Sequence, residues 1–103
     1  MSTIVDHIGV PALLEQTAEE CCELAQACLK MARKLRDENP TPKSIEDIRE
    51  NLIEEMADVE LCLLQIEMST DIVSSKEVDS LILEKFSRWE KRLGLNIDLE
   101  EIE

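Results

Sequence analysis

The sequence contains few of the residues that build β-sheets and their turns. Its 103 residues include one Phe, one Trp, no Tyr, 2 Gly and 3 Pro. Strands favour aromatic and β-branched residues and are bounded by turn residues, so this composition argues against a β-rich fold. The chain has no run of 18 apolar residues and no secretory leader, so we expect neither a membrane span nor export. The composition predicts an all-α, cytoplasmic protein that forms a single domain over residues 1–103.

Positive charge is also scarce. Lys and Arg number 11 against 24 Asp and Glu, which gives a formal net charge of −13. Nucleic-acid binding depends on neutralising phosphates with Lys and Arg, and anionic membrane surfaces attract the same residues. We therefore expect that neither a nucleic acid nor a membrane is a partner of this chain.

The cysteines do not form a zinc or redox motif, because no two of them have C-x-x-C spacing. There are four, at Cys21, Cys22, Cys28 and Cys62. In the absence of a secretory signal, we expect reduced thiols that pack as small apolar residues.

Apolar residues recur at alternating steps of three and four in three segments, which predicts three helices. The first is expected over residues 11–38 and the second over 45–68, separated by the helix-breaking stretch Asn39–Pro42. The third follows a capping box formed by Ser74 and Glu77 and stops at Gly94, and residues 94–103 form an acidic tail.

Each long helix has one stripe of residues that is expected to be buried. In the first helix the stripe is Leu14, Thr17, Cys21, Leu24, Cys28, Met31 and Leu35. In the second it is Ile45, Ile48, Leu52, Glu55, Val59, Cys62 and Ile66. Two such stripes bury too little for a stable monomer. We expect the two helices to pack antiparallel and to form a four-helix-bundle-like core by dimerisation, with a tetramer as the alternative.

Glu55 is the member of these stripes that does not suit a core. Asp58 lies three residues further on, so both carboxylates can point at one spot. Glu20 and Glu23 are also three apart and border the stripe of the first helix. Antiparallel packing would bring the four together, and a divalent cation would relieve their repulsion. Oxygen ligands suit Mg²⁺, Mn²⁺ or Ca²⁺. The alternative is a solvated acidic face, which a chain with 24 acidic residues can form by chance.

The acidic residues form a two-part motif, Glu19-Glu20-Cys21-Cys22-Glu23 and Glu55-Met56-Ala57-Asp58. This motif resembles the E-E-x-x-E … E-x-x-D signature of the MazG-like family of all-α nucleoside triphosphate pyrophosphohydrolases. The resemblance covers about residues 11–93. The 31 residues between Glu23 and Glu55 are slightly more than the usual family gap.

The resemblance implies hydrolysis of a (deoxy)nucleoside triphosphate between the α- and β-phosphates, which gives a monophosphate and pyrophosphate. It implies that Mg²⁺, with Mn²⁺ possible, is bound by Glu20, Glu23, Glu55 and Asp58. It assigns Glu19 to orienting or deprotonating the attacking water. It also implies basic phosphate contacts after the second half of the motif, for which the candidates are Lys85, Arg88 and Arg92.

Two other functions remain open on the sequence. Phosphoribosyl-ATP pyrophosphohydrolases are similar in fold and metal motif, and nothing in the sequence separates the two substrates. A helical interaction module without turnover would use the same apolar stripes, but it would gain nothing from burying Glu55 and Asp58. The base and sugar preference of the substrate is not readable from the sequence.

Overall fold

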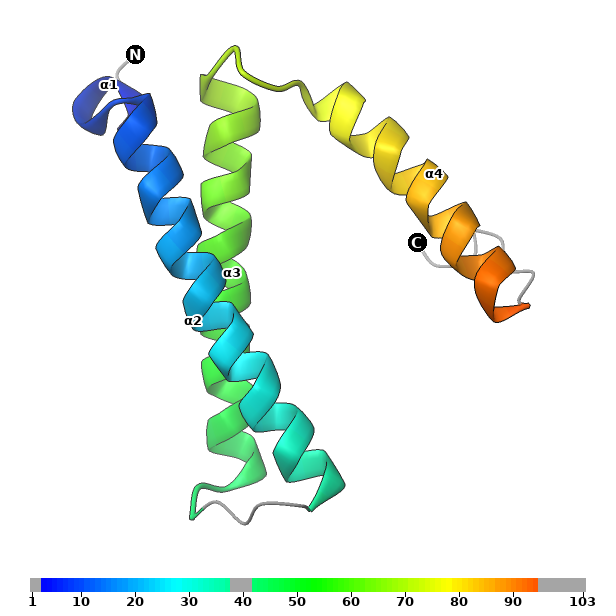
Figure 1. Ribbon diagram of the computed structural model, residues 1–103. Helices are drawn as coiled ribbons and strands as arrows, with labels where there is room; N and C mark the ends of the chain where they lie inside the picture. Colours follow the sequence, from blue (N-terminus) through cyan, green and yellow to red (C-terminus); the bar gives the residue numbers. More distant parts are fainter. Residues whose placement is uncertain (1–2, 38–41, 95–103) are drawn as a thin grey trace. The chain divides into compact units, whose positions relative to one another are not determined.

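The computed structural model describes residues 3–37 and 42–94, which form four α-helices and no strand. These are α1 (Ile4–Ile8), α2 (Val10–Arg36), α3 (Ile45–Ser69) and α4 (Ser75–Leu93) (Figure 1). The all-α class is confirmed. The chain divides into two compact units, Met1–Ile72 and Val73–Glu103, and α4 belongs to the second. The predicted acidic tail, apart from Gly94, lies outside the described residues.

The long helices begin and end close to the predicted positions because their ends carry strong capping signals. The hydroxyl of Ser44 accepts a hydrogen bond from the backbone N–H of Asp47 at the start of α3. Ser74 and Glu77 form the predicted capping box at the start of α4, and Gly94 ends that helix in the left-handed conformation.

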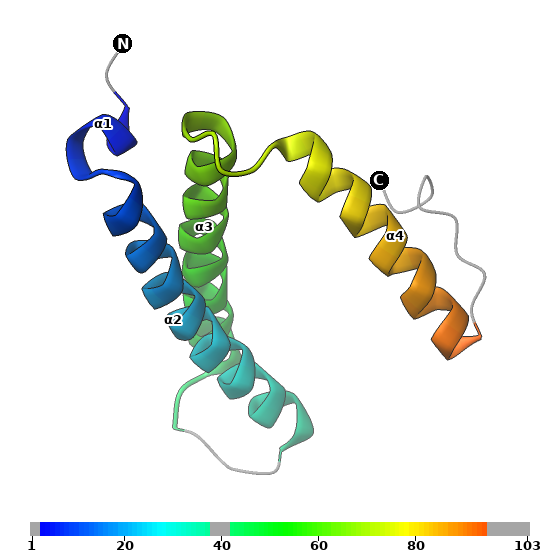
Figure 2. The ribbon, with the colours of Figure 1, turned by 45° about the horizontal axis from the view of Figure 1, so that its top comes forward.

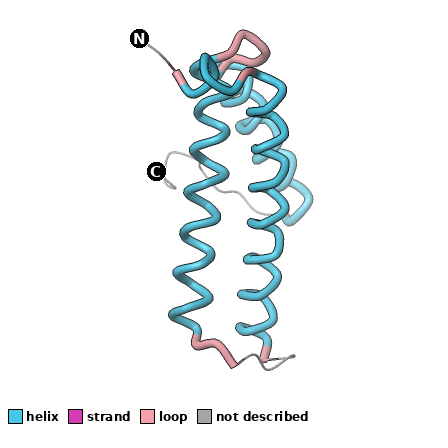
Figure 3. The backbone as a smooth tube through the Cα atoms, turned by 90° about the vertical axis from the view of Figure 1, so that its left-hand side faces the viewer, coloured by secondary structure: helices cyan, strands magenta, loops and turns pink. Residues whose placement is uncertain are grey.

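Helices α2 and α3 lie side by side and run in opposite directions (Figures 1 and 3). The buried residues of this unit lie on these two helices: Leu13, Ala27, Ile48, Val59 and Cys62. On α3 the predicted stripe is found from Ile48 onward, because Leu52, Glu55 and Ile66 are half-buried, but its first member, Ile45, is 38% exposed.

On α2 the predicted stripe is wrong at every second position. Leu14 is 43% exposed and Leu35 is 70% exposed, and Cys21 and Cys28 are exposed as well. The stripe that faces α3 is shifted by one residue at these places and consists of Leu13, Thr17, Glu20, Leu24, Ala27 and Met31. Both stripes alternate steps of three and four, so periodicity does not distinguish them, and composition favours the more apolar one. The observed stripe includes Glu20 instead of Cys21, which places a carboxylate directly between the helices.

The expectation that the cysteines pack as small apolar residues is correct for one of the four. All are free thiols, but only Cys62 is buried. Cys21 and Cys28 are exposed because they belong to the stripe that does not face α3, and Cys22 is exposed one position further along the helix.

Helix α1 was not expected from the sequence. Thr3 and Asp6 form a complete capping box at its start, and this T-x-x-D pattern was the available signal. Gly9 ends α1 with φ +84°, a conformation that is costly for other residues, and its N–H donates to the Val5 carbonyl over 2.8 Å. The turn at Gly9 packs α1 against α2 and α3 near the end of the pair (Figure 2).

Many large apolar side chains on the described helices are exposed. On α3 they include Ile53, Met56, Leu61, Leu63, Leu64 and Met68. On α4, Trp89 is 61% exposed. Within the described residues, no helix combines the length and the apolar character that crossing a membrane requires.

Candidate metal centre

Helices α2 and α3 bring four carboxylates to one point. Each of these residues offers an oxygen atom, and the four oxygens all lie within 4.8 Å of one another. We call these four residues the carboxylate cluster: Glu20, Glu23, Glu55 and Asp58. Each helix contributes two members, spaced three residues apart on one face.

The cluster contains two buried oxygen atoms that are not hydrogen-bonded. Oε2 of Glu20 and Oε2 of Glu55 are both inaccessible to solvent, and neither has a hydrogen-bond partner among the described residues. A buried polar atom without a partner has lost its hydrogen bonds to water and gained none in return, and the cost is larger when the group is charged. One such atom comes from each helix, so the α2–α3 interface concentrates unbalanced negative charge at this point.

The chemistry of the cluster fits a hard divalent cation. All four donors are carboxylate oxygens, which Mg²⁺, Ca²⁺ and Mn²⁺ prefer, and a cation would give the two unpaired oxygens a partner. Opposite ligands of Ca²⁺ are about 4.6–5.2 Å apart, and those of Mg²⁺ about 4.0–4.2 Å. Separations of up to 4.8 Å therefore suit Ca²⁺ directly. For Mg²⁺ the carboxylates must approach slightly, or water must replace one of them.

Burial raises the pKa of the Glu20 carboxyl above its ordinary value of 4.5, because desolvation disfavours the charged form. The negative charges of Glu23 and Asp58 raise this pKa further. A hydrogen bond from Gln16 acts in the opposite direction and lowers it. Without a bound cation, Glu20 thus keeps its proton to a higher pH than an ordinary glutamate does.

In the metal-free protein, Glu20→Gln is expected to raise Tm at neutral pH by a few degrees. Because the folded-state pKa of Glu20 is raised, this residue stabilises the fold below its unfolded-state pKa, and that stabilisation is lost as pH rises through the folded-state pKa. Gln imitates the protonated form at every pH. The difference in Tm should therefore shrink as pH falls toward about 5, which is still above the isoelectric point of about 4.4. Thermal unfolding of both proteins in EDTA across this pH range measures the difference in Tm.

Glu19→Gln is the matched control, because it removes one carboxylate from the adjacent, exposed position. An equal rise in Tm for both variants would show that net charge, and not the cluster, is responsible.

Glu19 is not brought into the cluster. It is exposed on α2, about 100° around the helix from Glu20, and it is not among the four residues whose oxygens converge. The role in activating water that the resemblance assigns to Glu19 stays a prediction.

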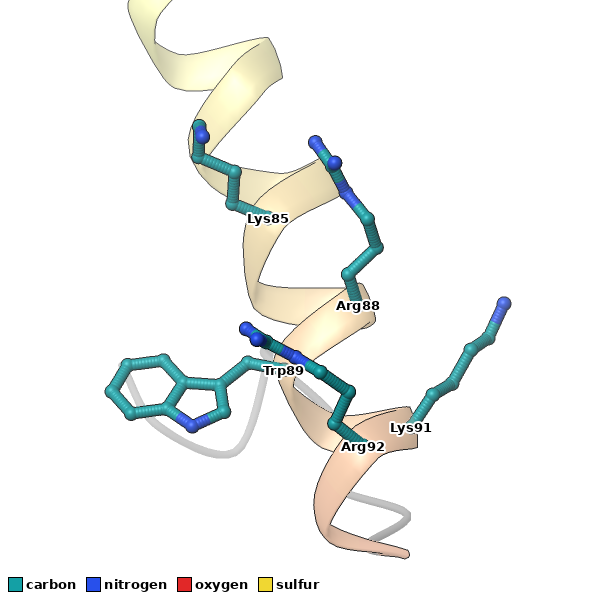
Figure 4. Close-up of a pocket in the computed structure, with 5 residues that line it drawn as sticks. All are labelled: Lys85, Arg88, Trp89, Lys91 and Arg92. Carbon is teal, nitrogen blue, oxygen red and sulfur yellow. The ribbon is translucent and has the colours of Figure 1, made fainter.

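The basic candidates lie on α4, in the second unit. Lys85, Arg88 and Arg92 occupy successive turns, and together with Trp89 and Lys91 they line a surface hollow of about 480 Å³ (Figure 4). Arg88 also lies 3.7 Å from Glu84, an exposed pair that adds little stability. The structure thus groups the three cations on one helix, and their binding of phosphate stays a prediction.

A cavity that the sequence did not indicate adjoins the cluster. It has a volume of about 200 Å³, and two cluster members, Glu20 and Asp58, form part of its wall. The remaining wall is largely apolar, with two amides, and consists of Ile4, Ile8, Leu13, Gln16, Leu61, Cys62 and Gln65. The sequence did not indicate this cavity because Ile4 and Ile8, which form part of its wall, belong to α1, a helix that was not expected. The arrangement offers an acidic end for a cation and an adjoining apolar space for an organic group.

Comparison with protein-family models, curated proteins and solved structures found no match for this chain.

Proposed function

We propose that this protein is a metal-dependent nucleotide pyrophosphohydrolase that cleaves (deoxy)nucleoside triphosphates between the α- and β-phosphates. One observation carries the proposal: the carboxylate cluster between α2 and α3, with one buried, unpartnered oxygen from each helix. A structural core gains nothing from these atoms, because replacing them with apolar groups would remove an electrostatic cost. The order and spacing of the acidic residues, which resemble the MazG-like signature, supply the reaction class.

The four cluster residues would hold the ion. With an ion held there, the site would gain positive charge to offset the repulsion of a triphosphate and a means of lowering the pKa of water. Glu19 would accept a proton as water adds to the α-phosphorus. The bond from this phosphorus to the bridging oxygen then breaks, and pyrophosphate leaves. Mg²⁺ is the proposed ion, with Mn²⁺ as the alternative.

We propose that the nucleoside part of the substrate binds in the cavity beside the cluster. Ile4 and Ile8 supply an apolar surface for a flat ring, while Gln16 and Gln65 can hydrogen-bond its edge. Because Glu20 and Asp58 border both regions, one ligand can occupy the cavity with its organic part and reach the ion with its phosphates.

We also propose that the chain acts as a homodimer. The support is the number of large apolar side chains that remain exposed on α2 and α3, which a second copy could cover. A tetramer is the alternative assembly.

Product analysis tests the reaction class. The purified protein is incubated with Mg²⁺ and a panel of ribo- and deoxynucleoside triphosphates, and pyrophosphate is separated from orthophosphate. We expect a monophosphate and pyrophosphate in equal amounts. Release of orthophosphate alone would overturn the proposed cleavage position. If no triphosphate reacts, phosphoribosyl-ATP is the next substrate, and failure there would favour the non-catalytic interaction module.

A further inference from the structure

Gln16 contacts the carboxylate cluster through a hydrogen bond. Its side-chain Nε2 donates to Oε1 of Glu20 over 2.7 Å, one helical turn away on α2. A bond from an amide to a charged carboxylate is stronger than one between neutral groups. The two residues are spaced i, i+4, so their side chains meet without strain on the helix surface.

This hydrogen bond fixes which Glu20 oxygen faces the cluster. Oε1 is engaged by Gln16, whereas Oε2 is the buried atom that has no partner. A free glutamate side chain has several rotamers, and holding one of them costs conformational entropy when an ion binds. The hydrogen bond from Gln16 already holds Glu20 in the rotamer that leaves Oε2 available. Less conformational entropy is therefore lost when the ion binds.

The same bond also fixes the orientation of the Gln16 amide. A carboxylate can only accept hydrogen bonds, so the NH₂ group must face Glu20, and a flipped amide would place two oxygens against each other. Gln16 also lines the 200 Å³ cavity. Gln16 therefore connects the two regions, because it lines the cavity and donates a hydrogen bond to a member of the cluster.

We propose that Gln16 is a positioning residue for the metal ion, which acts through Glu20 and raises the affinity of the cluster for the ion. This inference rests on the proposed function in one respect, namely that the cluster binds a divalent cation. Outer residues that orient a metal ligand typically contribute about 10–100-fold to metal affinity or activity.

Gln16→Met tests the proposal, because Met keeps the length of the side chain and removes the donor. The matched control is Gln65→Met, which makes the same change in a second glutamine of the cavity wall that has no bond to the cluster. Mn²⁺ binding is measured without nucleotide, from the electron paramagnetic resonance signal of the free ion, at a temperature where all variants are folded. We expect Gln16→Met to weaken Mn²⁺ binding about tenfold and Gln65→Met to leave it unchanged.

A kinetic readout separates positioning from general damage to the fold. The Mg²⁺ concentration that gives half-maximal activity should rise about tenfold in Gln16→Met, and excess Mg²⁺ should recover activity, which it could not do if the fold were damaged. Equal Mn²⁺ affinity in Gln16→Met and the wild type would overturn the inference and leave the metal site intact. Absence of Mn²⁺ binding by the wild type would instead overturn the proposed function.

Discussion

Glu55→Gln is expected to lower the rate of pyrophosphate release by more than about a hundredfold, because loss even of an outer residue at a metal site costs 10–100-fold. The substitution replaces the carboxylate that supplies one of the two buried, unpartnered oxygens. Gln has the same shape but no charge, and it offers only one oxygen. The variant should fold at least as well as the wild type without metal, because a buried charge that lacks a partner has been removed. Steady-state rates with the best triphosphate of the panel measure the effect.

Glu54→Gln is the matched control for this experiment. Glu54 precedes Glu55 on α3, is exposed and lies outside the cluster, so the change in charge is the same while the site is untouched. We expect its rate to stay within about twofold of the wild type, as is usual for a surface substitution. If Glu55→Gln kept more than about a tenth of the wild-type rate, Glu55 could not be an essential ligand.

Divalent cations are expected to raise Tm strongly. An ion present at 100 times its Kd stabilises the folded state by about 2.7 kcal/mol. In a domain of about this size, each kcal/mol shifts Tm by about 4–8 °C, so the expected rise is roughly 10–20 °C. The effect is large because the ion removes the repulsion among four carboxylates in addition to gaining its own ligands. Differential scanning fluorimetry with Mg²⁺, Mn²⁺ and Ca²⁺ also ranks the three ions.

Potassium chloride at matched ionic strength controls for screening, since a chain with a net charge of −13 gains stability from any added salt. Glu55→Gln should show only this salt effect. If K⁺ and Mg²⁺ raised Tm equally, the cluster would be an acidic surface and not a metal site.

The bounds of the long helices are largely determined by local sequence. Ser44, Ser74 and Gly94 act through hydrogen bonds and backbone conformations within a few residues, so their effect does not depend on the tertiary fold. Most of the buried face of α3 is also readable, because Ile48, Val59 and Cys62 lie at predicted positions and are buried. The pairing of Glu20 with Glu23, and of Glu55 with Asp58, follows from helical spacing in the same way.

The face that α2 presents to α3 was decided only in the tertiary structure. Two stripes on α2 have the same period, and the one with Cys21 is more apolar than the one with Glu20. Which of them is buried depends on the position of α3, whose own Glu55 lies opposite at the cluster. The cavity depends in the same way on the turn at Gly9, which folds α1 back onto the helix pair. Local sequence thus sets the three longer helices and the acidic residues that share a face. Tertiary packing decided which face was buried, because that choice depends on contacts between residues far apart in the chain.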